Sequence, residues 1–288
     1  MMPLSAQEIL RIKRAQQNRK RKVRKLPKPP RMAFPKGLQR DYSRQLVALV
    51  KVIYEVYEEL LIPHLESIVA EANLLRPDRA DDWNDSLDRQ FEQVKNRLTE
   101  EFVIAESVAM GIGQEISDWN DREWRKVLKA VFKAEIVQRE AWLAQEMNTF
   151  VKENVSLITS IKDDSVREIE GIIRRGVQSG KRHEQLAVQI RERYATDRRR
   201  AQVIARDQVS KFNGNLTMLR QQNMGVRKYI WHTSGDRRVR PTHEANEGQV
   251  FSWDYPPATG HPGEEVQCRC TAEAVFEDTM AQQIMLEE

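Results

Sequence analysis

Apolar residues recur at helical spacing over the first half of the chain. A period of three to four residues places them along one face of a helix. The first such stripe comprises Leu46, Val47, Val50, Ile53, Tyr54, Tyr57, Leu60 and Leu61. Pro63 is expected to interrupt or bend this helix, because proline lacks an amide hydrogen, and a second helix is predicted over residues 63–75. A third helix is marked by Trp83, Leu87, Phe91, Val94 and Leu98.

A further long helix is predicted from about residue 120 to residue 136. Gly111 and Gly113 allow a break in the chain before it. Asn120, followed by Glu123 three residues later, has the pattern of a capping box at the start of a helix. The apolar stripe of this helix is Trp124, Val127, Leu128, Val131, Phe132 and Ile136.

Three helices are predicted after residue 160. Ser165 is suited to cap the first, and Gly180 is suited to end it. The second is short and contains Leu186, Ile190 and Tyr194. The third is predicted to begin near Thr196 and Asp197, and Gly225 is suited to follow its end.

Two strands complete the predicted elements. Residues 228–233 alternate in polarity, with Tyr229, Trp231 and Thr233 on one side, and residues 266–276 hold Cys268 and Cys270 on the apolar face of a last strand. The predicted fold is α+β, a mainly helical N-terminal part followed by a small α+β module. The predicted divisions are a disordered basic arm over 1–40, a helical scaffold over 41–160, the module over 161–276 and a tail over 277–288.

The composition limits the classes of protein to consider. The 288 residues are 40% hydrophobic and 31% charged, which is enough for a core beneath a highly charged surface. Two cysteines form no disulfide framework, and this favours a reducing compartment. No run approaches the roughly 20 apolar residues of a membrane span, and no apolar segment follows the basic N-terminus as in a secretory signal.

Positive charge is concentrated at the N-terminus. Residues 1–40 hold 13 Lys/Arg and one acid, a balance of +12, whereas the remaining residues carry a balance of −8. Such a basic segment is suited to bind DNA phosphates without regard to base sequence. A solvated tail, or one that docks on an acidic partner, is the alternative. The predicted DNA contacts are Arg19, Lys20, Arg21, Lys22, Arg24 and Lys25.

A second group of charged residues lies near the C-terminus. Its members are Arg206, Asp207, Asp236, Arg238, Arg240 and His243. The last four lie within eight positions of one another, and Arg206 is suited to pair with Asp236. Such a group forms either a salt-bridge network that braces a loop or an active site. We favour the structural role, because a charged cluster alone does not establish catalysis.

Four residues of the same region have the side chains of a zinc site: His243, His261, Cys268 and Cys270. Residues two apart on a regular strand are separated by about 6.6–6.8 Å, whereas two sulfurs on one tetrahedral zinc lie within about 4 Å. A Cys268–Cys270 disulfide is disfavoured by the same separation. We therefore expect two buried thiols and no cofactor, with a zinc site as the alternative.

The order of five sequence blocks is specific when they are taken together. They read ARDQVSKFNG, YIWHTSGDRRVRPTH, EGQVFSW, PPATGHPGE and CRC. With their spacing, this part of the chain, residues 163–276, resembles the phage minor head proteins, the Mu F-like head morphogenesis family. Many members have Thr-Glu where this chain has Asp207 and Gln208, which leaves the role of that helix face open.

The resemblance implies a non-enzymatic virion component. Its implied partners are the phage portal protein, capsid or scaffold proteins, and double-stranded DNA. It implies a location in the host cytoplasm during assembly and then inside the phage head, with a role in head assembly and in DNA packaging or ejection. The alternative is a metal-dependent nuclease or effector enzyme, with His243 as a base and with Asp236, His261, Cys268 and Cys270 around the metal.

Overall fold

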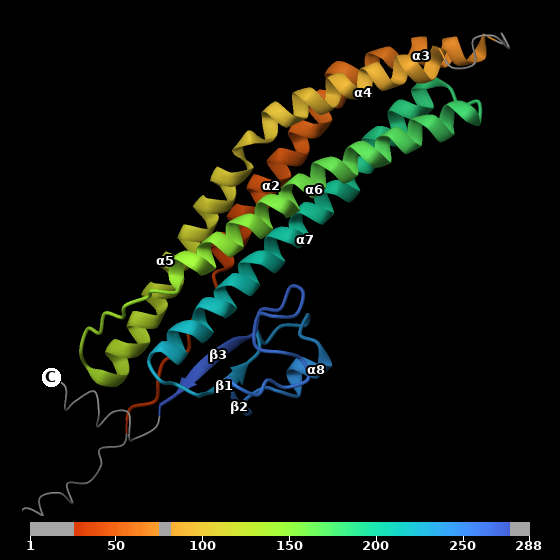
Figure 1. Ribbon diagram of the computed structural model, residues 1–288. Coiled ribbons are helices and arrows are strands. Elements are labelled where there is room, and N and C mark those ends of the chain that lie inside the picture. The colour runs from red at the N-terminus through yellow and green to blue at the C-terminus, as the bar shows by residue number, and fades with distance from the viewer. Residues whose placement is uncertain (1–25, 75–81, 277–288) are drawn as a thin grey trace, which may run out of the picture.

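The fold is an elongated bundle of antiparallel helices with a small sheet packed beside it (Figure 1). The computed structural model describes residues 26–74 and 82–276. Two helical rows form the first half of the bundle: α2 (Lys36–Val56) with α3 (Leu65–Asn73), and α4 (Asp82–Glu101) with α5 (Ala105–Phe132). The second half comprises α6 (Leu143–Gln178) and α7 (His183–Asn223). None of the described helices is long and apolar enough to cross a membrane.

The first helical row bends at Pro63, as predicted. A π-helical turn (Tyr57–Leu61) and a 3-10 turn (Ile62–His64) separate α2 from α3. Proline cannot donate the amide hydrogen of a regular α-helix, so the hydrogen-bond pattern changes on its N-terminal side. The predicted stripe faces inward, since Leu46, Val50 and Ile53 are fully buried.

The predicted break and capping box in the next row are both wrong, because α5 is continuous through them. Gly113 lies at a close helix contact, where an added Cβ would come within 2.8 Å of Met147 Sδ. Asn120 lies mid-helix and donates to Thr217 Oγ1 of α7 at 2.7 Å. Glu123 accepts a bond from the amide of Ala33 at 3.1 Å. These residues therefore connect α5 to other segments and do not begin a helix.

The two last helices are longer than predicted. Ser165 caps no helix, because it lies inside α6 and accepts a hydrogen bond from Tyr57 at 3.1 Å. The two helices predicted between residues 183 and 223 are one helix of 41 residues. Asp197, the expected start of the second, is buried and accepts a bond from Tyr54 at 2.9 Å. Gly180 and Gly225 do follow helix ends, with φ of 72° and 78°.

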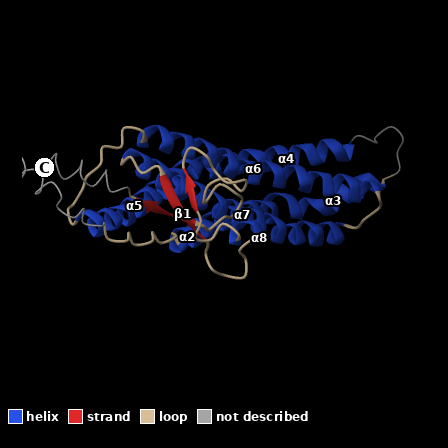
Figure 2. Ribbon diagram, turned by 90° about the horizontal axis from the view of Figure 1, so that it is seen from below, coloured by secondary structure: helices blue, strands red, loops and turns tan. Residues whose placement is uncertain are grey.

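The sheet has three antiparallel strands in the order β2–β1–β3. They are β1 (Lys228–His232), β2 (Val250–Ser252) and β3 (Thr271–Val275), and a short helix, α8 (Pro241–Glu244), lies in the loop between β1 and β2. Tyr229 of β1 is opposite Phe251 and Ala274. Figure 2 shows the sheet and its loops on one side of the helices. The last strand begins at Thr271, so the prediction that it includes Cys268 and Cys270 is wrong.

The N-terminal segment is attached to the body from residue 26 onward. Met32 is buried in a small core with Trp124, Val226 and Ala274. Arg31 Nε lies 3.6 Å from the buried carboxylate of Glu273. Helix α2 begins at Lys36, so the arm boundary predicted at residue 40 lies too far along the chain. The predicted DNA contacts, residues 19–22, 24 and 25, lie outside the described residues, as does the predicted tail over 277–288.

Helix α6 spans the predicted boundary between residues 160 and 161. The main core also combines residues from both sides of it, such as Leu46 and Ile53 of α2 with Val209 and Leu216 of α7. The helical part and the module are therefore packed around one shared core.

Candidate functional site

The long loops between the strands are held at Asp236 by one ion pair and one backbone hydrogen bond. Arg269 donates to both of its carboxylate oxygens, with Nη2 at 2.7 Å from Oδ1, and the amide of Arg238 donates to Oδ1 at 3.0 Å. The hydrogen bond from Arg269, followed by that from the Arg238 amide, lowers the pKa of Asp236 to about 2. The partner of Asp236 is thus Arg269, in place of the predicted Arg206.

A second set of bonds connects α8 with the loop before β3. Arg240 Nη2 donates to the carbonyl of Val266 at 2.7 Å, and Arg240 Nη1 lies 3.1 Å from Glu265 Oε2. His243 Nε2 lies 2.7 Å from the same oxygen of Glu265. The carboxylate of Glu265 therefore positions both Arg240 and His243.

Helix α7 holds the same loop from the other side. Asp207 Oδ1 accepts the amide of Gln267 at 3.0 Å, and Oδ2 lies 2.8 Å from Lys211 Nζ. Gln267 has φ of 57°, a left-handed conformation that few side chains adopt without such support. Five of the six residues predicted as a loop network make bonds within these loops, and Arg206 does not.

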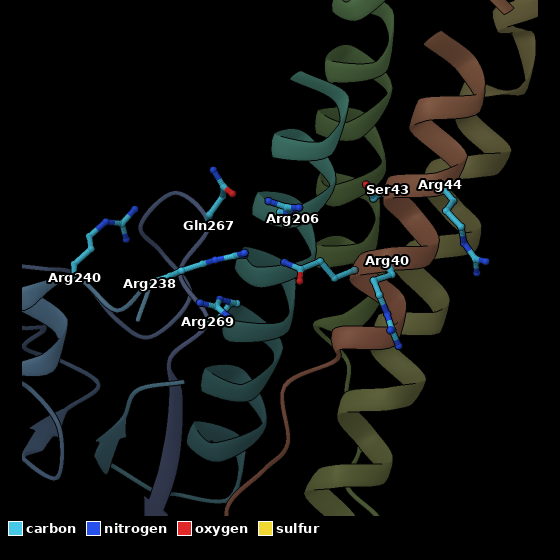
Figure 3. A pocket seen from close by; sticks show the side chains of 9 residues that line it. Arg40, Ser43, Arg44, Arg206, Arg238, Arg240, Gln267 and Arg269 are labelled. Carbon is cyan, nitrogen blue, oxygen red and sulfur yellow. The ribbon is translucent and has the colours of Figure 1, made fainter. Parts of the chain in front are cut away.

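Arg206 instead lines a pocket of about 560 Å³ between α7, the first turns of α2 and the loops (Figure 3). Six of its lining residues are arginines: Arg40, Arg44, Arg206, Arg238, Arg240 and Arg269. Three have carboxylate partners, namely Asp41, Glu265 and Asp236. Within the described residues, no carboxylate forms an ion pair with Arg40, Arg206 or Arg238. In Figure 3 the side chains of Arg206, Arg238 and Arg269 lie in the middle of the pocket view, whereas those of Arg40, Arg44 and Arg240 extend away from them. Guanidinium groups are suited to bind phosphate or carboxylate groups.

Three of the four residues considered for zinc converge behind this loop. Nδ1 of His243 lies 3.4 Å from Cys270 Sγ and 3.6 Å from Cys268 Sγ, and all three side chains are buried. His261 lies elsewhere, with its Nδ1 at 2.9 Å from the hydroxyl of Tyr229. The sulfur separation predicted from a regular strand is wrong, because the three ligand atoms all lie within 4.8 Å of one another.

The pKa values of the two thiols are shifted in opposite directions. A hydrogen bond from Cys270 is the main cause of the lowered pKa of Cys268, and the amides of Cys270 and Gly263 add to it. The hydrogen bond to Cys268, together with burial, raises the pKa of Cys270. Cys268 is therefore the first of the pair to become a thiolate. Burial lowers the pKa of His261, which favours its neutral form.

Several residues of the site were missed by the sequence analysis. Arg269 lies between Cys268 and Cys270 in the sequence. In an extended segment, neighbouring side chains point to opposite faces, so the Arg269 side chain is expected on the face away from the two cysteines. This alternation is the sequence signal that could have placed Arg269 in the loop network. Arg40 and Arg44 are one helical turn apart on α2, but only the tertiary fold brings them to the pocket. Glu265 carries no local signal, because it acts through residues distant in sequence.

The architecture defines the class of protein as a helical bundle that carries a small, loop-rich α+β domain. Residues 167–273, from the middle of α6 into β3, match the family described as phage Mu protein F like protein. The chain therefore contains a domain that is similar to the phage Mu protein F like family, and this match confirms the resemblance seen in the sequence blocks.

An uncharacterised protein of Haemophilus influenzae is 36% identical over 137 residues. The match covers 47% of this chain and 31% of that protein, so the chain spans about a third of the relative's length. No solved structure matches the chain.

Proposed function

We propose that the protein is a minor head protein, a non-enzymatic virion component that acts in head assembly and in the packaging or delivery of the genome. The Mu F-like domain over 167–273 is the observation that carries this proposal. The proposed partners are the portal protein and capsid or scaffold proteins. The proposed location is the host cytoplasm during assembly and afterwards the interior of the head.

The bonding of the loops supports a structural role. Asp236 is paired with Arg269, and Glu265 with both Arg240 and His243. Each of these groups is committed to a partner in the same loops or in α8. Such mutual pairing braces a loop, whereas a catalytic group is usually held with its reactive atom directed at a substrate. This arrangement favours the minor head protein over the nuclease or effector enzyme.

Association with assembling heads is the direct test. A tagged chain expressed with the head proteins of its own phage should sediment with procapsids and should be recovered with the portal protein. Recovery only as free protein, while complete heads still form, would contradict the proposal. Cleavage of DNA by the purified protein with added divalent metal, lost in His243→Ala, would instead favour the enzyme.

Contact with packaged DNA is proposed for the basic residues Arg19, Lys20, Arg21, Lys22, Arg24 and Lys25. The arginine pocket supports an additional contact, because the side chains of Arg206 and Arg238 line it and form no ion pair with a carboxylate among the described residues. Arginine fits phosphate oxygens with two parallel hydrogen bonds. We therefore propose that the pocket takes a phosphate group of the DNA backbone.

The double variant Arg206→Ala, Arg238→Ala should bind duplex DNA more weakly, to a similar extent for all base sequences. The magnitude of the slope of log affinity against log salt should fall by about 1, because the loss of one phosphate contact removes about 0.9. Fluorescence anisotropy at several salt concentrations measures the DNA affinity and this slope. The control is Arg191→Ala, which removes an exposed arginine paired with Glu58. Unchanged DNA binding with loss of portal recovery would assign the pocket to an acidic protein surface.

A further inference from the structure

The atoms of His243, Cys268 and Cys270 have the spacing of metal ligands. Zinc–sulfur bonds of about 2.3 Å and zinc–nitrogen bonds of about 2.05 Å at a tetrahedral angle place N and S about 3.6 Å apart. The observed distances from His243 Nδ1 to the two sulfurs are 3.4 and 3.6 Å. The two N–S distances therefore match those of a zinc tetrahedron, and all three ligand atoms lie within 4.8 Å of one another.

The histidine is oriented as a metal ligand would be. Its Nε2 lies 2.7 Å from Glu265 Oε2, so the proton of a neutral ring is held at Nε2. The lone pair of Nδ1 is then directed at the two sulfurs. A carboxylate behind the second ring nitrogen is the usual partner of a metal-binding histidine, because it sets the tautomer and the ring orientation.

The sulfur of Cys268 is surrounded by hydrogen-bond donors. The amides of Gly263 and Cys270 donate to it at 3.4 and 3.5 Å. These donors favour the thiolate, which is the form that binds a metal. Two thiolates and a neutral imidazole around a divalent ion give no net charge, and this lowers the cost of burial.

Hydrogen-bonded thiols without a metal are the competing arrangement. In it, the thiol of Cys270 donates to Cys268, and only one S–H can donate to the single lone pair of His243 Nδ1. A cation satisfies the nitrogen and both sulfurs together. Soft sulfur ligands with one imidazole favour zinc over magnesium or calcium, which prefer oxygen ligands.

We propose that His243, Cys268 and Cys270 bind one zinc ion that fastens α8 to the segment before β3. The fourth coordination position is assigned to a solvent molecule, because no fourth His, Cys, Asp or Glu atom joins this group within the described residues. Glu265 is assigned as the positioning residue of His243. The site goes beyond the proposed head function and does not depend on it.

The test is metal analysis of the full chain purified under reducing conditions. About one zinc per chain is expected after removal of loosely bound metal, as for a structural site of high affinity. The cobalt-substituted protein should show the intense absorption of thiolate-to-cobalt charge transfer. Cys268→Ser, Cys270→Ser and His243→Ala should each lose this absorption, whereas Glu265→Gln should weaken zinc binding about 10–100-fold.

The matched control is His261→Ala, which removes another buried histidine of the same domain and should keep full zinc content. Circular dichroism of each variant separates loss of the ligand from loss of the fold. Three results would overturn the site: no zinc after reconstitution of the folded protein, equal zinc in wild type and His243→Ala, or a Cys268–Cys270 disulfide in protein kept reduced.

Discussion

Arg220 uses all of its hydrogen-bonding capacity inside the protein. Its side chain is 1% exposed and lies 2.6 Å from Glu140. Further bonds reach Glu140, both the carbonyl and the hydroxyl of Ser117, and the side chain of Asn120. The five donors of the guanidinium therefore all have partners. This residue joins α7 to α5 and to the segment before α6, which its position near a helix end does not reveal.

We predict that Arg220→Ala lowers the free energy of unfolding by about 3–5 kcal/mol, because the largely covered carboxylate of Glu140, which is 14% exposed, is left without its partner. Arg191→Ala is the control, since Arg191 forms a similar two-bond pair with Glu58 on the surface. It should cost only about 0–1 kcal/mol. Urea denaturation followed by circular dichroism measures both. If the two variants lose equal free energy of unfolding, burial of the Arg220–Glu140 pair does not increase its contribution to stability.

At the scale of the elements, close backbone contacts set the place of the module on the bundle. A Cβ at Gly214 of α7 would lie 2.5 Å from the carbonyl oxygen of Pro262. A Cβ added at the neighbouring Gly263, where φ is 101°, would lie 2.8 Å from the carbonyl oxygen of Ser210. Helix α7 can therefore pack closely against the loop before β3, because Gly214 has no side chain at the point of contact. This gives a physical reason for the glycine that ends the first sequence block.

We predict that Gly214→Ala destabilises the protein by about 1–3 kcal/mol, because the loop must move to admit a methyl group. The matched control is Gly111→Ala in α5, where nothing lies within 4 Å of the added Cβ. That change should stabilise the protein by up to about 1 kcal/mol, the difference in helix propensity. Thermal unfolding of both variants is the measurement. A stabilised Gly214→Ala would contradict the close contact.

At the scale of the whole molecule, α7 serves both the bundle and the module. Its residues Ala205, Val209 and Leu216 are in the main core with α2, while Gln221 near its end donates to the carbonyl of Ala272 in β3 at 3.1 Å. The Mu F-like domain is thus continuous with the helical part, although its family match begins only at residue 167.

We predict that a fragment of residues 161–276 does not fold cooperatively, because removal of α2 and α5 exposes the inner face of α7 to water. The fragment should give a poorly dispersed amide NMR spectrum and a broad thermal transition, in contrast to the full chain. A well-dispersed spectrum and a sharp transition would instead support two separable domains.

The sequence by itself determined the features that depend on near neighbours. The buried stripe of α2, the bend at Pro63, the glycines after α6 and α7 and the strand at β1 all follow from spacings of a few residues. Periodicity and turn chemistry are local properties, so they could be interpreted without knowing which segments meet. The order of the sequence blocks likewise indicated the family.

Only the tertiary structure decided the features that depend on distant partners. In the sequence, Asp197 has the signal of a helix start and Asn120 that of a helix cap. In the structure, Asp197 accepts a hydrogen bond from Tyr54, and Asn120 donates one to Thr217. The two cysteines meet His243 because the chain turns at Gln267, which Asp207 of α7 holds in place. A polar side chain has the same local sequence signal in either role, and burial with a specific partner is what selects between them.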